Sequence, residues 1–214
     1  METMFDCIRR NIAKHVALSD AEFERFTSVL QHRHLAKKAS LLTAGEVCRF
    51  EGYVVAGCLR VFYTDLQGTD HILYFAPEDW WVGDIASFIS QSPALLSVDA
   101  LEATDVLLID KPDKERLYAD VPKFERLFRV MTQRALAELQ RRMITMMHQT
   151  AEVRYAEFKR RYPNLEERVP QHQIAAYLGI SPEFLSRIRH KQDVRRAERP
   201  DRSGQAPEHA SLVR

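Results

Sequence analysis

The stretch QHQIAAYLGISPEFLSRIRHK, residues 171–191, decides the C-terminal fold of this chain. Ile174 and Leu178 lie four residues apart, a spacing that places both on one face of a short helix. Gly179 follows at once, and glycine readily adopts the left-handed conformation that ends helices. Ser181 can then cap a second helix. Two helices joined by so tight a turn are typical of the helix-turn-helix motif.

The second helix of this motif has an inner and an outer face. Leu185 and Ile188 would pack inward, which leaves hydrogen-bond donors and acceptors outside. Arg187 can donate two hydrogen bonds to a guanine, and Glu183, one turn earlier, can accept one from a cytosine. A solvated ion pair between these two residues is the alternative interpretation. The candidate DNA-binding residues are Glu183, Ser186, Arg187, Gln171, His172, Arg189, His190 and Lys191.

Short apolar runs separated by glycines predict an antiparallel β-roll in the first half of the chain. Of the seven glycines, five fall in this region: Gly45, Gly52, Gly57, Gly68 and Gly83. They separate runs rich in β-branched and aromatic residues: YVVA (53–56), CLRVFY (58–63) and HILYFA (71–76). The segment DLQG (65–68) is typical of a hairpin turn. We therefore expect a sensor-like domain over residues 1–116, with short helices leading into the roll.

A long amphipathic helix is predicted over residues 117–150. Apolar residues recur there every three or four positions: Leu117, Val121, Phe124, Phe128, Met131, Ala135, Leu139 and Met143. Such a helix far exceeds the average of about 12 residues, and a small β-roll cannot bury its whole stripe. A second copy of the same helix would bury it, which predicts a homodimer. The alternative is a helix that lies along its own domain.

The remaining segments are predicted as a helix-turn-helix domain over 151–192 and a disordered tail over 193–214, rich in arginine and proline. The whole is an α+β chain: an N-terminal antiparallel β-roll of double-stranded β-helix or jelly-roll type, a long dimerisation helix, and a C-terminal helix-turn-helix. The last part is winged-helix-like, but its wing is minimal or absent because little sequence follows the second helix.

This order of parts resembles the CRP/FNR superfamily of transcriptional regulators. The resemblance covers roughly residues 5–192, and its most specific part reads Ala175-Ala-Tyr-Leu178-Gly179-Ile-Ser181-Pro-Glu183-Phe-Leu-Ser186-Arg187. It implies that Glu183, Ser186 and Arg187 contact bases. The segments FAPEDWWVGDIASF (75–88) and RVPQHQIAAYLGISPEFLSRIR (168–189) look similar to members from Bacteroidetes-type bacteria.

The resemblance implies a dimeric, sequence-specific, DNA-binding transcription regulator in the cytoplasm. Two copies of Arg187 would enter successive major grooves about 34 Å apart, on a near-palindromic double-stranded operator. RNA polymerase is a candidate partner of such a regulator. The alternative function is a small-molecule-binding β-roll whose C-terminal helices bind a protein partner. The sequence contains no P-loop, nucleophile elbow, dinucleotide fingerprint or HExxH helix, so we expect no enzyme.

The sensor region departs from the phosphate-binding cassette of the cyclic-nucleotide-binding members, which reads Gly-Glu-x-Ala followed by Pro-Arg-Ser/Thr-Ala. In the matching places this chain has an aspartate, Asp84, for the glutamate, and Ala94 and Leu95 for the arginine and the hydroxyl. A buried phosphate without a cationic partner is costly. We therefore expect no cyclic AMP binding through this cassette, and the effector stays unknown.

A candidate effector pocket remains near Arg60, Trp80, Trp81, Gly83 and Asp84, although structural packing of the two tryptophans is the plainer interpretation.

The composition and net charge exclude several other classes of protein. The formal net charge of +1 excludes a uniformly basic protein, so affinity for DNA must come from a local cluster. No apolar run is long enough for a membrane span. Cys7, Cys48 and Cys58 form no CxxC pair, which argues against a cysteine-based metal site. The isolated histidines His32, His34 and His71 are weak haem candidates, and we expect neither a cofactor nor a metal.

Overall fold

The computed structural model describes the backbone of residues 4–197 and the side chains of residues 4–194. Two short helices, α1 (Met4–Ala13) and α2 (Asp20–Thr27), precede the β region. The strands are β1 (Gln31–Leu35), β2 (Ser40–Leu42), β3 (Phe50–Ala56), β4 (Leu59–Thr64), β5 (Asp70–Ala76), β6 (Trp81–Val82), β7 (Ser97–Ala100) and β8 (Thr104–Asp110). A short helix, α3 (Ile85–Ser90), lies between β6 and β7.

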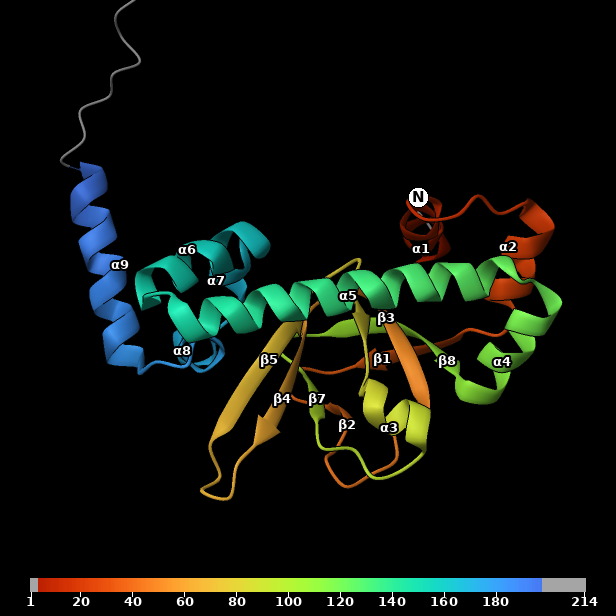
Figure 1. The fold of residues 1–214 in the computed structure, drawn as a ribbon, viewed down its shortest axis with the longest axis horizontal. Helices are drawn as coiled ribbons and strands as arrows, with labels where there is room; N and C mark the ends of the chain where they lie inside the picture. Colours follow the sequence, from red (N-terminus) through yellow and green to blue (C-terminus); the bar gives the residue numbers. More distant parts are fainter. Residues whose placement is uncertain (1–3, 198–214) are drawn as a thin grey trace, which may run out of the picture.

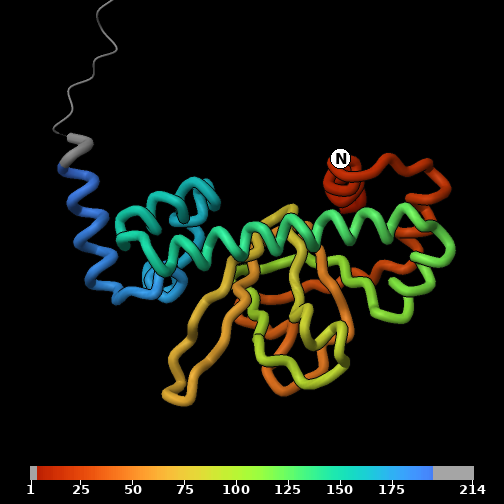
Figure 2. Tube along the Cα trace, in the orientation of Figure 1, coloured from red at the N-terminus to blue at the C-terminus, as the bar shows by residue number. Residues whose placement is uncertain are grey.

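The strands form two four-stranded sheets, in the orders β1-β8-β3-β6 and β2-β7-β4-β5. Their pairings are antiparallel, and the predicted hairpin turn joins β4 to β5. Inward-facing side chains of both sheets make one apolar core, in which Val54, Leu59, Val61, Val98 and Val106 are fully buried. This arrangement confirms the predicted antiparallel β-roll (Figure 2).

The predicted helix over 117–150 is divided into two helices, α4 (Lys111–Asp120) and α5 (Lys123–His148). The break falls at Val121 and Pro122. A residue before proline is disfavoured in the α region, and Val121 accordingly lies at φ −138° and ψ 88°. The prediction of one continuous helix was therefore wrong at its N-terminal end.

Helix α5 crosses the molecule above the β-roll (Figure 1). Its first half is buried against its own domain, where Phe124, Leu127 and Phe128 join a core with α1, α2 and α4. The second half exposes apolar side chains, including Leu136, Leu139, Met143, Ile144 and Met147. The interpretation of a helix that lies along its own domain thus applies to the first half of α5, and burial of the second half by another copy stays a prediction.

Four helices complete the described chain: α6 (Ala151–Arg161), α7 (Leu165–Arg168), α8 (Gln171–Leu178) and α9 (Pro182–Ala197). Helix α9 runs five residues into the predicted tail, because no glycine or proline interrupts it before Pro200. The rest of that tail, 198–214, lies outside the described residues. Within residues 4–197 no strand follows β8, so the helix-turn-helix has no wing in this part of the chain.

Candidate DNA-contacting helix and sensor site

The turn between α8 and α9 has the geometry that the sequence predicted. Gly179 ends α8 in the left-handed conformation at φ 65° and ψ 41°, and the Ile180 N–H donates to the Ala175 carbonyl at 3.1 Å. The Ser181 hydroxyl accepts the Phe184 N–H at 3.2 Å, which caps the first turn of α9. The Gln171 side chain donates to the carbonyl of Pro182 at 3.0 Å. These bonds fix α9 rigidly against α8.

One face of α9 is exposed and polar. Glu183, Ser186, Arg187 and His190 are exposed at helical spacing, whereas Leu185 and Ile188 between them are buried. The guanidinium of Arg187 lies 5.2 Å from the centre of the exposed Phe184 ring.

Glu183 stays ionised on this face. A hydrogen bond from its own backbone amide lowers the pKa of Glu183, with further help from Ser181 and from the charge of Arg187. Within the described residues Glu183 and Arg187 form no direct ion pair, so both keep free hydrogen-bonding groups.

The four other members of the predicted DNA-binding set have different positions. Arg189 turns inward, where its Nη2 lies 3.0 Å from Glu166 Oε1 and its Nε donates to the Tyr155 hydroxyl at 3.1 Å. This contact anchors α9 on α6 and α7, and it removes Arg189 from the free cations of the surface. Gln171 joins α8 to α9, as described above. His172 and Lys191 stay exposed at the edges of the motif.

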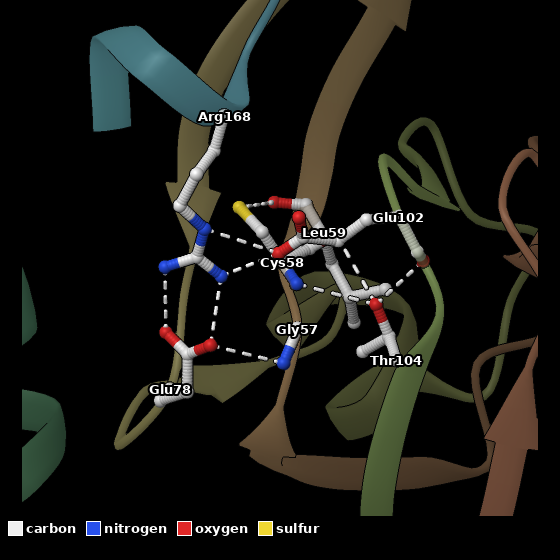
Figure 3. Close-up of polar contacts among 7 residues, drawn as sticks. All are labelled: Gly57, Cys58, Leu59, Glu78, Glu102, Thr104 and Arg168. Carbon is white, nitrogen blue, oxygen red and sulfur yellow. Dashed lines mark hydrogen bonds and ion pairs between the residues drawn. The ribbon is translucent and has the colours of Figure 1, made fainter. Parts of the chain in front are cut away.

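The helix-turn-helix is docked on the β-roll by an arginine that the sequence did not single out. Figure 3 shows Arg168, at the end of α7, reaching between Glu78 and Glu102. Its two Nη atoms lie 2.9 and 2.7 Å from the Glu78 carboxylate oxygens. Glu78 also accepts the Gly57 N–H at 3.0 Å. Burial alone would raise the pKa of Glu78, but the hydrogen bonds from Arg168 hold it below the usual value.

Aromatic side chains make this docking surface continuous with the core of the roll. Phe75, on β5, is fully buried, and its ring centre lies 5.6 to 6.1 Å from those of Phe158, Tyr162 and Tyr177. The backbone N–H of Phe75 donates to the Tyr162 hydroxyl at 3.4 Å. The two domains therefore share one hydrophobic cluster.

The residues of the predicted effector pocket have separate partners. Trp80 stacks on Tyr162 at 5.3 Å, whereas Trp81 packs between Tyr53 and Phe128 at 5.5 and 5.2 Å. Adjacent residues on a strand point to opposite faces, which explains the divergence.

Arg60 is held by Asp70 and Asp99 at 2.9 and 3.0 Å, and it covers the Phe62 ring. Gly83 packs against the carbonyl of Phe50, and a Cβ there would approach that oxygen to 3.3 Å. Arg60, Trp80, Trp81 and Gly83 thus each have partners within the chain, and their role in an effector pocket stays a prediction.

Asp84 occupies the place where a cyclic phosphate would need hydrogen-bond donors. Its carboxylate is almost fully buried and caps α3 by accepting the Ser87 N–H at 3.0 Å. The second oxygen accepts the N–H groups of Leu95 and Leu96, each at 3.2 Å. The carboxylate of Asp84 thus occupies these amides itself, and within residues 4–194 it forms no ion pair with a cation. A phosphate bound at these amides would meet the negative charge of this carboxylate.

We accordingly expect no binding of cyclic AMP. Isothermal titration should give no saturable heat, which corresponds to a Kd weaker than about 1 mM. A second negative charge next to the buried Asp84 would lack any cation to offset it. Saturable micromolar binding, competed by cyclic GMP, would contradict this expectation.

Other chemistry-bearing residues pair locally. His32 and His34 flank Asp105 at 2.8 and 3.0 Å, and His71 lies 2.7 Å from Asp65. Among residues 4–194 no group of three histidine, cysteine or acidic side chains is arranged to hold a metal ion. No helix in the described part of the chain has the length and apolar character needed to span a membrane.

This architecture is similar to that of known proteins. Residues 32–120 match the family model of the cyclic nucleotide-binding domain. Among curated proteins, none matches the chain. The structure is similar to that of the c-di-GMP-responsive global regulator CLP of Xanthomonas campestris, with a TM-score of 0.68 at 16% identity, covering 83% of this chain and 93% of that one.

Two further solved structures have the same arrangement. FixK2 of Bradyrhizobium japonicum superposes with a TM-score of 0.67 at 19% identity, covering 78% of this chain and 86% of that one. The catabolite activator protein of Thermus thermophilus gives 0.53 at 22% identity, with 84% and 85% covered. Residues 32–120 thus resemble a cyclic nucleotide-binding domain, and a helix-turn-helix follows them in the chain. The fold of the chain is that of these solved regulators, which agrees with the resemblance to the CRP/FNR superfamily seen in the sequence.

Proposed function

We propose that this protein is a dimeric, sequence-specific DNA-binding transcription regulator of the CRP/FNR type. The outer face of α9 carries this proposal. It presents Glu183, Ser186, Arg187 and His190 on a helix that is capped at its start and buttressed from behind. A guanidinium and a carboxylate one turn apart can read a guanine and a cytosine in a major groove.

The second half of α5 supports the dimeric state. Leu139, Met143 and Met147 expose 51, 58 and 72% of their surface, and no residue in the described part of the chain covers them fully. An apolar stripe of this kind on a long helix is buried well by a second copy. A twofold axis along the two α5 helices would present two α9 helices to half-sites about 34 Å apart, on a near-palindromic operator.

The effector of this regulator is a ligand other than cyclic AMP, or none. Asp84 supports this part of the proposal, because its carboxylate already takes the amides of the cassette. RNA polymerase is the protein partner that we propose for the DNA-bound dimer.

Replacing Arg187 by alanine tests the proposed function. Fluorescence anisotropy on fragments of the protein's own upstream region should show specific binding by the wild type without added ligand. The Arg187→Ala variant should lose about 1–3 kcal/mol, or about 5- to 150-fold in Kd, because the guanine loses its bidentate donor. Arg33→Ala is the matched control, since Arg33 is exposed on β1 and lies outside the helix-turn-helix.

The salt dependence separates the outcomes of this experiment. Specific binding should survive at the higher of two salt concentrations, whereas backbone attraction fades steeply. If the wild type and Arg187→Ala bind every fragment with equal affinity, and only at the lower salt concentration, the proposal fails. The alternative function would then be favoured: the β-roll would bind a small molecule, and the C-terminal helices would bind a protein partner.

A further inference from the structure

Residues of α5, α6 and α8 line a cleft. These three helices meet at the end of the long helix that carries the helix-turn-helix (Figure 1). The free volume of the cleft is about 100 Å³, which is enough for a small ligand and several times what one water needs. The charged side chains that line it are Arg141, Arg142, Arg154, Arg160, Arg161, Glu138 and Glu157. Five arginines face two glutamates, so the lining has a large excess of positive charge.

The two glutamates are already engaged. Glu138 pairs with Arg161, at 2.7 Å, and also with Arg141. Glu157 accepts a hydrogen bond from the Thr145 hydroxyl at 3.2 Å. Glu138 is therefore shared between two arginines, and Glu157 leaves one carboxylate charge against the three other arginines, Arg142, Arg154 and Arg160. The lining keeps an excess of positive charge.

Arg142 lies at the floor of the cleft without an anionic partner in the described part of the chain. Its Nη2 donates to the carbonyls of Ile72 and Tyr177, each at 3.0 Å, and its guanidinium covers the Tyr177 ring at 3.9 Å. Burial lowers the pKa of Arg142, and the charge of Arg161 lowers it further. A part-buried cation of this kind is stabilised by an anion.

Arg154 is the second incompletely satisfied arginine. Its Nη1 donates to the Met146 carbonyl at 3.3 Å, whereas its Nε is buried and has no acceptor among the described residues. A buried donor without a partner is rare in native proteins. The planar fork of a guanidinium matches a phosphate, which can accept from two of its nitrogens at once.

We propose that this cleft is a binding site for a small phosphate-bearing anion, held chiefly by Arg142 and Arg154. The site is separate from the cassette around Asp84. On α5 its residues Arg141, Arg142 and Thr145 lie on the side opposite to the exposed apolar stripe. A homodimer through that stripe would therefore leave the cleft open. Because α5, α6 and α8 all line it, a bound anion would tie the long helix to the helix-turn-helix.

Direct titration without DNA tests the site independently of the proposed function. Sodium pyrophosphate, inorganic phosphate and AMP are titrated by calorimetry at constant ionic strength, with sodium chloride as the blank. Trp80 is a second probe, since the Arg161 guanidinium lies 5.0 Å from its ring. We expect saturable binding of pyrophosphate, accompanied by a change in tryptophan fluorescence.

Variants of Arg154 give the decisive comparison. Arg154→Gln should weaken pyrophosphate binding at least about 10-fold, because a charge-assisted pair is lost, and Arg154→Lys should restore part of it. Arg126→Gln is the matched control, since Arg126 is exposed on the first half of α5 and does not line the cleft. Circular dichroism of each variant verifies that the fold is kept.

The affinities for the different titrants show whether the site prefers a free phosphate or a nucleotide. Equal affinity for phosphate and AMP supports a free phosphate group, and tighter binding of AMP supports a nucleotide. The absence of saturable binding, or equal binding by the wild type and Arg154→Gln, would overturn the proposal. So would a response to duplex DNA alone, which would assign these arginines to the DNA backbone.

Discussion

Replacing Glu51 by leucine is expected to lower the free energy of unfolding by about 3–5 kcal/mol. Glu51, on β3, and Lys114, on α4, form an ion pair in which both side chains are almost fully buried. The Lys114 Nζ lies 3.9 Å from the centre of the Phe128 ring, at the junction of the β-roll with α5. Without the carboxylate an ammonium group would be left uncompensated in this apolar junction, which explains the size of the loss.

The same variant should show a characteristic pH dependence. Burial lowers the pKa of Lys114 to about 8, whereas the pKa of a lysine in the unfolded chain is near 10.5. Between these values the unfolded chain binds more protons than the folded one, so the free energy of unfolding contributed by Lys114 rises with pH. Without the carboxylate the pKa of Lys114 falls further, so the variant is relieved of the buried ammonium charge as the pH rises. The loss caused by Glu51→Leu should therefore be smaller at a pH of about 9.5 than at about 7.

Urea unfolding of a small set of variants checks both expectations. The double variant Glu51→Leu with Lys114→Met should recover most of the stability, because a packed apolar pair replaces the ion pair. Asp120→Asn is the matched surface control: its pair with Arg25 is solvated, and the change should cost at most about 1 kcal/mol. A loss below about 1 kcal/mol for Glu51→Leu, independent of pH, would contradict the assigned burial of the pair.

The parts of the fold that rest on local signals could be predicted from the sequence. Gly179 and Ser181 decide the turn between α8 and α9 through their own backbone preferences. Pro122 also indicates the break before α5. The apolar residues, however, keep a helical spacing across this proline, and that spacing predicted one continuous helix.

The site was predicted less completely, for two different reasons. Arg189 lies four residues after the buried Leu185, so the helical period alone places it on the inner face. The helical period thus predicted an inward position for Arg189. The positive charge of its side chain nevertheless led to its assignment as a DNA-binding residue. The pairing of Arg168 with Glu78 had no such signal, because the two residues are 90 positions apart. Contacts of that separation depend on how α7 docks on the roll, which no local pattern encodes.

Replacing Phe75 by alanine should lower the free energy of unfolding by about 3–5 kcal/mol, since a fully buried phenylalanine is lost from a closely packed cluster. The cluster includes Tyr162 and Tyr177, so the loss should be felt by the β-roll and the helix-turn-helix together. Tryptophan fluorescence reports the contacts of the roll with α5 and α6, because Trp81 packs on Phe128 and Trp80 on Tyr162. Far-ultraviolet circular dichroism reports the helices, and both transitions should coincide in the wild type and in the variant. Leu66→Ala, at the exposed tip of the β4–β5 hairpin, should change stability by no more than about 0.5 kcal/mol.

Two separate transitions in the wild type would mean that the domains unfold independently, and then the position of α9 would not be set by β5. Coincident transitions together with the expected loss in Phe75→Ala would mean that the roll and the helix-turn-helix unfold as one unit to which the Phe75 cluster contributes. A change in the packing of β5 would then be felt by the helix that we propose reads DNA.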